Sequence, residues 1–145
     1  MDTQIPKQRR IVVGVDGSST SKAALAWAVR EAVRTGALVE AVTAYYWYPM
    51  PIKDIDFKSV AQDVLADAIR EAVSLDGPVE IMSKVVEGNA ARALLDAAAT
   101  ADLLVVGSRG RGGFTEALLG SVAQHCVHHS ACPVVVVRAS QVSRD

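Results

Sequence analysis

Short runs rich in β-branched residues alternate with longer, alanine-rich runs along the chain. The expected strands are 11–16, 38–46, 79–86, 103–107 and 133–138, and the expected helices are 18–35, 58–75, 89–99 and 118–130. Strands separated by helices pair in parallel, because each helix returns the chain to the same end of the sheet. The pattern predicts a Rossmann-like, doubly wound open α/β sandwich with five parallel strands and the last strand at an edge.

The size and composition of the chain favour one domain. With 145 residues, of which 50% are hydrophobic and only 5% aromatic, the core should consist mainly of Ala, Val, Leu and Ile. We expect this domain to span residues 11–138, between loose tails at 1–10 and 139–145.

Charge and cysteine content exclude several classes of partner. The formal net charge of −1 gives no electrostatic reason to expect binding to nucleic acid or to an anionic membrane. No apolar run approaches the roughly 20 residues that a membrane-spanning helix needs. The two cysteines, Cys126 and Cys132, suggest no disulfide framework, so a reduced, cytoplasmic setting is the simplest interpretation.

The expected fourth strand leads into a glycine-rich, cationic loop, GSRGRGGFTEALLGS at 107–121. Glycines let backbone N–H groups approach an anion, and the helix that follows adds partial positive charge. The loop contains neither a GxxxxGK[ST] phosphate loop nor a G-x-G-x-x-G fingerprint. Because Asp16, Gly88 and this loop all follow strands, they should meet at the carboxyl edge of the sheet, where ligands of such folds bind.

Four segments together resemble the universal stress protein family (UspA-like). They are IVVGVDGS at 11–18, VTAY at 42–45, VVEGNAARALLDAA at 85–98, and DLLVVGSRGRGGFTEALLGSVAQHCVHHSACPVVVVR at 102–138. The pattern G-x2-G-x9-G-[ST], carried by the ATP-binding branch of that family, is complete from Gly107 through Gly110 to Gly120 and Ser121. The resemblance implies a fold like that of the adenine nucleotide alpha hydrolases, with ATP and its accompanying Mg²⁺ as the ligand.

The family's contacts to the base and the sugar can be carried across position by position. The resemblance implies backbone contacts to the base from Val13, Gly14 and Val15, and from Ala44 on the second strand. Asp16 is expected near the ribose or a nucleotide-bound Mg²⁺; the alternative is that its carboxylate only caps the following helix.

The remaining implied contacts concern the sugar and the phosphates. Contacts to the ribose and phosphates are expected from Gly107, Gly110, Gly120 and Ser121. Val86 is expected beside the sugar, and Val122 is expected to contribute an amide at the helix N-terminus. Arg109 and Arg111 either neutralise phosphate charge or are solvated surface side chains.

The segment HCVHHSAC at 125–132 permits another interpretation. His125 and His129 are spaced i, i+4 on a helix, and with Cys126 or Cys132 they could hold a metal. However, no second ligand pair of matching spacing occurs elsewhere, and Cys126 falls on the apolar side of the helix. We therefore predict a packed thiol at Cys126 and no metal site.

The last strand bears on assembly. Pro133 to Arg138 (PVVVVR) is strongly apolar, and at a sheet edge it exposes a surface for strand pairing. Family members dimerise by pairing this strand, so the resemblance implies a homodimer; the alternative is that the chain's tail covers the strand.

No catalytic set stands out, because hydrolysis needs a placed water and a base, and no base can be nominated. The residues therefore favour a nucleotide-binding module over an efficient enzyme, with slow ATP hydrolysis at most, and the family resemblance implies that this module responds to nucleotide in stress or signalling. Two alternatives stay open: an adenylate-handling hydrolase or transferase, and a dimeric interaction protein that binds AMP, cyclic AMP or no nucleotide. The glycine motif does not separate ATP from AMP or cyclic AMP, because one phosphate fits the same cradle.

Overall fold

The computed structural model describes residues 8–46, 55–73, 77–110 and 119–138. Strands and helices alternate through these residues as predicted. The elements are β1 (Arg10–Gly14), α1 (Ser19–Thr35), β2 (Leu38–Tyr45), α2 (Phe57–Val73), β3 (Glu80–Glu87), α3 (Ala90–Ala98), β4 (Leu103–Gly107), α4 (Ser121–His129) and β5 (Val134–Val137).

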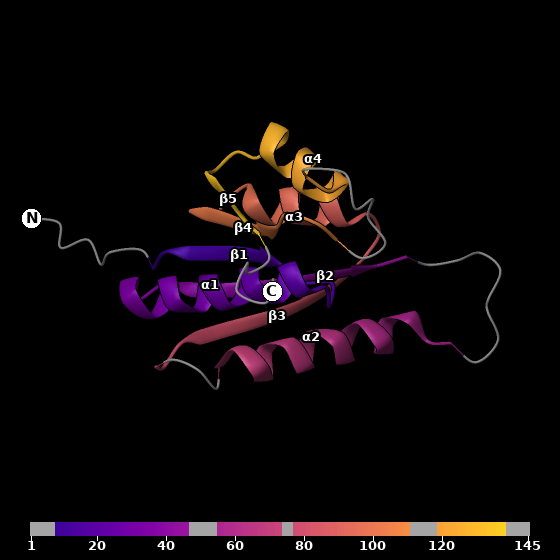
Figure 1. The fold of residues 1–145 in the computed structure, drawn as a ribbon, viewed down its shortest axis with the longest axis horizontal. Coiled ribbons are helices and arrows are strands. Elements are labelled where there is room, and N and C mark those ends of the chain that lie inside the picture. The colour runs from indigo at the N-terminus through magenta and orange to yellow at the C-terminus, as the bar shows by residue number, and fades with distance from the viewer. Residues whose placement is uncertain (1–7, 47–54, 74–76, 111–118, 139–145) are drawn as a thin grey trace, which may run out of the picture.

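The five strands form one parallel sheet in the order β3-β2-β1-β4-β5 (Figure 1). The chain runs outward from β1 to β3, and then crosses back to β4 on the other side of β1. The doubly wound fold is therefore confirmed, with β5 at one edge. The strand order reverses between β1 and β4, which is where ligands bind in sheets of this kind.

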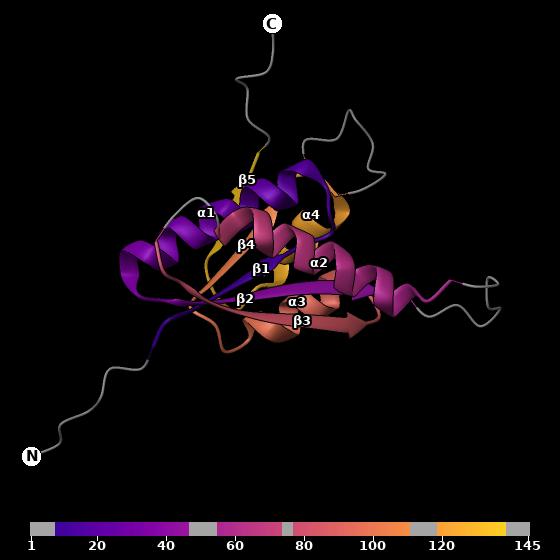
Figure 2. The same cartoon turned by 90° about the horizontal axis from the view of Figure 1, so that it is seen from below.

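Two helices cover each face of the sheet (Figures 1 and 2). The core beneath α1 and α2 is built around side chains such as Val13, Leu25 and Leu65. The core beneath α3 and α4 includes Val12 and Leu94. Neighbouring residues of a strand point to opposite faces, so β1 supplies both cores.

Side chains cap three of the four helices. Ser18 accepts a hydrogen bond at the start of α1, Asn89 does so at the start of α3, and Asp56 accepts from the Ser59 N–H in the first turn of α2. α1 ends at Gly36, whose positive φ of 78° is the left-handed conformation that favours glycine. Serine at the start of α1 and glycine after its end are the residue types expected for a helix cap and a helix stop.

Several boundaries differ from the expectation by one to three residues, and three of them bear on the architecture around the sheet edge and the start of β1. α4 begins at Ser121 instead of Leu118, because Gly120 has an extended backbone with φ −69° and ψ 166°. Arg10, expected in the tail, is the first residue of β1, where its N–H donates to Asp102 Oδ2 at 2.9 Å. β1 ends at Gly14, so Asp16 follows the strand by two residues.

Residues 47–54, between β2 and α2, lie outside the described part of the chain. Within the described ranges, no helix has the length and apolar character needed to cross a membrane.

Candidate functional site

One pocket lies at the carboxyl ends of β1, β2 and β4, on the side of the sheet that α3 and α4 cover. The residues lining it are Gly14, Val15, Asp16, Ser21, Val42, Ala44, Ala90, Leu94, Val106, Gly107, Arg109, Gly110, Val122 and Ala123. Val42, Ala44 and Val106 form an apolar floor that is continuous with the core beneath α3 and α4. Polar groups come from the segments that follow the strands, so the pocket has an apolar floor and a polar rim.

Most of the residues implied by the family resemblance meet here. Those that line the pocket are Gly14, Val15, Asp16, Ala44, Gly107, Arg109, Gly110 and Val122. The other four, Val13, Val86, Gly120 and Ser121, do not line the pocket. Val13 is fully buried in the core beneath α1 and α2, and Val86 is the strand partner of Ala44.

Six lining residues were not predicted from the sequence: Ser21, Val42, Ala90, Leu94, Val106 and Ala123. One signal for Leu94 was available at Gly14, which interrupts a buried apolar run. A β-carbon on Gly14 would lie only 2.7 Å from Leu94 Cδ1, so the glycine makes room for this leucine. A glycine inside a strand often marks such a close approach.

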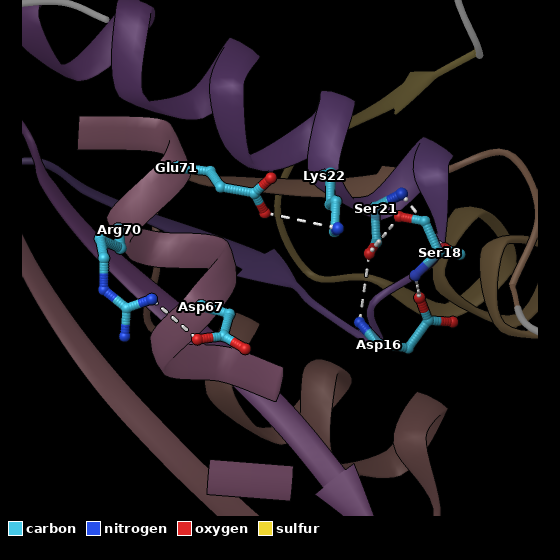
Figure 3. Close-up of polar contacts among 7 residues, drawn as sticks. All are labelled: Asp16, Ser18, Ser21, Lys22, Asp67, Arg70 and Glu71. Carbon is cyan, nitrogen blue, oxygen red and sulfur yellow. Dashed lines mark hydrogen bonds and ion pairs between the residues drawn. The ribbon is translucent and has the colours of Figure 1, made fainter. Parts of the chain in front are cut away.

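Hydrogen bonds with Ser18 and Ser21 hold Asp16 at the start of α1 (Figure 3). The Ser18 N–H donates to Asp16 Oδ1 at 2.8 Å, and the Asp16 N–H donates to Ser21 Oγ at 3.2 Å. The helix cap itself is Ser18, whose Oγ accepts from the Ser21 N–H at 3.3 Å. Asp16 therefore orients the capping residue while its carboxylate lies at the pocket rim.

The neighbouring helices are also tied together close to this turn. Lys22 Nζ lies 3.4 Å from Glu71 Oε2, which links α1 to α2 (Figure 3). Both side chains are about half exposed or more, so this ion pair adds little to stability.

The glycine-rich segment leaves β4 in close contact with the first turn of α1. A β-carbon on Gly107 would lie 2.5 Å from Thr20 Oγ1 and 2.8 Å from the Ser21 nitrogen. The buried Thr20 hydroxyl donates to the Arg109 carbonyl. A β-carbon on Gly110 would lie 3.0 Å from Asp16 Oδ2. The segments after β1 and β4 therefore meet at the switch point, as predicted from the strand ends.

The two ends of the loop come back together. The Gly120 N–H donates to the Ser108 carbonyl at 2.7 Å, and the Ser108 N–H donates to the Val137 carbonyl at 2.8 Å. A β-carbon on Gly120 would lie 3.3 Å from the Gly110 nitrogen. Residues 111–118, including Arg111, lie outside the described part of the chain.

The N-terminus of α4 differs from the other helix starts, because its N-cap residue, Gly120, makes no side-chain capping hydrogen bond. The first N–H groups of a helix have no intrahelical acceptor, and they carry the positive end of the helix dipole. Val122 and Ala123, in the first turn, line the pocket. This arrangement offers N–H donors to an anion at the rim.

The cysteine on the buried face of α4 is a packed thiol, as predicted. Cys126 is fully buried among apolar side chains of the core beneath α3 and α4. This burial raises the pKa of its thiol to about 11, so the group is neutral near pH 7. Among the described residues, no three His, Cys, Asp or Glu side chains are placed to hold one metal ion.

Comparison with known proteins agrees with this architecture. The model of the universal stress protein family matches residues 7–138. Universal stress proteins Rv2005c and Rv2623 of Mycobacterium tuberculosis are 37% and 38% identical to the chain over 141 residues. Each alignment covers 93% of this chain and 47% of the relative, so the chain spans about half the length of these curated relatives.

Solved structures show the same fold. A universal stress protein in complex with cAMP is 30% identical, with a TM-score of 0.74, and the match covers 92% of this chain and 98% of that one. The universal stress protein UspA from Lactobacillus plantarum is 26% identical, with a TM-score of 0.75, over 92% of this chain and all of that one.

Proposed function

The chain belongs to the universal stress protein family, and we propose that it binds an adenine nucleotide, with ATP as the preferred ligand, in the pocket at the switch point. The similar structure that contains cAMP supports an adenine nucleotide as the ligand class. We further propose that binding makes the protein a nucleotide-responsive stress or signalling module in a cytoplasmic setting. Slow ATP hydrolysis is the most that we expect of it as an enzyme.

The observation that carries this proposal is the uncapped start of α4 at the rim of an apolar pocket. The other three helices satisfy N–H groups of their first turns with a serine, an aspartate or an asparagine side chain. Gly120 has no side chain to cap the corresponding donors of α4, and a β-carbon on it would lie 3.3 Å from the Gly110 nitrogen. A phosphate group is the ligand that such donors favour.

The shape of the pocket suggests how a nucleotide lies in it. The base and the sugar would pack on the apolar floor of Val42, Ala44 and Val106. The phosphates would then extend toward the first turn of α4 and the exposed Arg109. Asp16 offers one carboxylate at the rim, and Mg²⁺ on a nucleotide is commonly held by one or two carboxylates together with the phosphates. The residues therefore fit a Mg-nucleotide, whose metal would screen the phosphate charge.

Binding would also stabilise the folded protein. A ligand present at 100 times its dissociation constant adds about 2.7 kcal/mol to the free energy of unfolding. We propose that this stabilisation acts on the segments after β1 and β4, because they meet at the pocket rim. A change in these segments would alter the protein surface at the pocket rim, and we propose that a partner protein recognises that surface.

The test is calorimetric titration of nucleotide-free protein with Mg-ATP, AMP and cyclic AMP, using two matched variants. Ser121→Asp places a negative charge at the first helical position, where it stabilises α4 by about 0.3–1 kcal/mol but repels phosphate. Ser121→Asn has a similar size and no charge. We expect Ser121→Asp to lower ATP affinity at least about tenfold, equivalent to about 1.4 kcal/mol, and Ser121→Asn to change it far less.

A second variant addresses the glycine motif. Gly120→Val brings a branched side chain against the Gly110 backbone and should abolish binding. Gly77→Val is its control, because a β-carbon there meets only Val33 Cγ1, at 3.5 Å. If wild-type protein binds none of the three nucleotides at millimolar concentration, the nucleotide proposal is wrong and an interaction protein with an empty pocket becomes the better interpretation.

The same titrations separate the alternatives. Tighter binding of cyclic AMP or AMP than of ATP would show that a single phosphate is the feature recognised. Sustained nucleotide turnover that disappears in Asp16→Ala would favour an adenylate-handling hydrolase or transferase.

We also propose that the chain forms a homodimer through β5. The strand lies at a sheet edge, and all four of its valines are only partly buried in the single chain. An apolar edge strand is a template for pairing with a second copy. Val135→Lys, on the side packed toward α1, and Val136→Lys, on the side packed toward α4, should each shift light-scattering mass from dimer to monomer. A monomeric wild-type protein would refute the proposal.

A further inference from the structure

His125 and His129 form an exposed pair on α4. Their ring centroids lie 6.1 Å apart, and the planes of the two rings are inclined by 36°. The residues are spaced i, i+4, the spacing at which two histidines on one helix face bind a single zinc ion in known metal motifs. His128 also lies near His129, with centroids 6.4 Å apart. However, adjacent residues of a helix do not face each other, so the chelating pair is His125 with His129.

His125 is held in the form that a metal ligand requires. Its Nδ1 lies 2.9 Å from the Ser121 carbonyl oxygen. A carbonyl can only accept, so Nδ1 carries the hydrogen and donates it, which leaves the lone pair of the neutral ring on Nε2. Metal-binding histidines commonly donate their second ring N–H to a carbonyl or carboxylate, and this bond fixes the ring and raises its basicity.

We propose that His125 and His129 chelate one divalent transition-metal ion through their Nε2 atoms, with water completing the coordination. Imidazole suits Zn²⁺, Ni²⁺ and Cu²⁺. With metal–nitrogen bonds of about 2.0–2.1 Å, two imidazoles on a tetrahedral ion have ring centroids roughly 5 Å apart. The two rings therefore close by about 1 Å on binding, a movement that side-chain rotation supplies because both rings are exposed.

The cysteines of this segment do not belong to the site. Cys126 lies on the buried face of α4, so it does not complete the cysteine-containing metal site that the sequence analysis weighed and argued against. Cys132 is partly buried beyond the end of α4, with its Sγ 3.5 Å from Ser130 Oγ. Because no three metal-binding side chains come together in the described residues, the site has two protein ligands and exchanges its ion readily. It does not rest on the proposed nucleotide binding.

The test is calorimetric titration of untagged protein with Ni²⁺, which does not oxidise thiols, above the usual histidine pKa of about 6.5. We expect one ion per chain. His125→Ala and His129→Ala should each lower the affinity at least about tenfold, because losing even an outer partner of a metal ligand costs 10–100-fold. His128→Ala and Cys132→Ser are the matched controls and should bind as the wild type does.

Two results would overturn the proposal. One is the absence of Ni²⁺ binding at millimolar concentration, and the other is a control variant that loses as much affinity as His125→Ala. Nitrogen-15 NMR of the imidazole rings gives an independent readout with Zn²⁺. The proposal requires the Nε2 resonances of His125 and His129 to shift, and a shift at Nδ1 of His125 instead would contradict it.

Discussion

Gly107→Ala should destabilise the protein because of a close approach between β4 and α1, whether or not a ligand is bound. The added β-carbon would lie 2.5 Å from Thr20 Oγ1, 2.7 Å from the Thr20 carbonyl carbon and 2.8 Å from the Ser21 nitrogen. Two of these atoms belong to the backbone, so a change of rotamer cannot relieve the contacts. The Thr20 hydroxyl cannot turn away freely either, because it donates to the Arg109 carbonyl.

The size of the effect follows from these contacts. Restoring ordinary separations moves the first turn of α1 away from β4 by roughly 0.6–0.9 Å, and overpacking of this kind costs about 1–3 kcal/mol. Weakening the buried Thr20 hydrogen bond adds about 1 kcal/mol. The sum, about 2–4 kcal/mol, is a large part of the 5–15 kcal/mol that typically separates folded from unfolded proteins.

The assay is urea unfolding without nucleotide. With a slope of about 2 kcal/mol/M, the middle of the usual range for urea, the midpoint of Gly107→Ala should fall by roughly 1–2 M while the slope stays unchanged. Gly77→Ala, an exposed glycine with no contact closer than 3.5 Å, is the control and should leave the midpoint near that of the wild type. A free energy of unfolding for Gly107→Ala within about 0.5 kcal/mol of the wild type would refute the close packing of Gly107 on α1.

Three further predictions concern a helix cap, a buried hydroxyl and a buried thiol. Ser18→Ala removes the cap of α1 and should lower the free energy of unfolding by about 0.5–2 kcal/mol, with Ser19→Ala as an exposed control. Thr43→Val removes a buried hydroxyl that donates to the Val15 carbonyl at 2.7 Å, and should cost about 1–3 kcal/mol in the same urea assay. Burial raises the pKa of Cys126 from 9.0 to about 11, so its contribution to stability is present below pH 9 and is lost as the pH rises toward 11. The difference between the urea midpoints of the wild type and of Cys126→Ala should therefore shrink over that pH range. A difference that stays constant would contradict the raised pKa of the Cys126 thiol.

Features set by local chemistry were predictable from the sequence. The Ser18 side chain caps α1 and the left-handed backbone of Gly36 ends it, so both limits of the helix depend on the residue types found at its two ends. The start of α4 was placed too early, because leucines before Gly120 continue a helical pattern that the extended backbone of Gly120 interrupts. Apolar periodicity therefore locates a helix better than it locates the helix's first residue.

The floor of the pocket was harder to predict than its rim. Val42, Val106 and Leu94 line the pocket, yet each carries the pattern of an ordinary core residue. Whether an apolar side chain faces packed atoms or an open space depends on contacts between distant elements, which periodicity does not contain. Polar and glycine residues after strand ends were easier to place, because a parallel sheet brings all of its carboxyl ends to one edge.

Two glycines of the motif, Gly107 and Gly120, make different close contacts in the structure, and the sequence alone does not distinguish them. Gly107 allows β4 to approach α1, and Gly120 lets the end of the loop return to the Ser108 carbonyl and the Gly110 backbone. Both close approaches serve the fold even if no nucleotide binds there. Loss of binding in a glycine variant is therefore ambiguous, because it follows equally from a misfolded loop. Ser121→Asp avoids this difficulty, since an exposed residue at the start of α4 can gain charge without disturbing loop closure. If that variant keeps its stability and loses ATP, the phosphate lies at the helix start; if it keeps both, the glycines serve the fold alone.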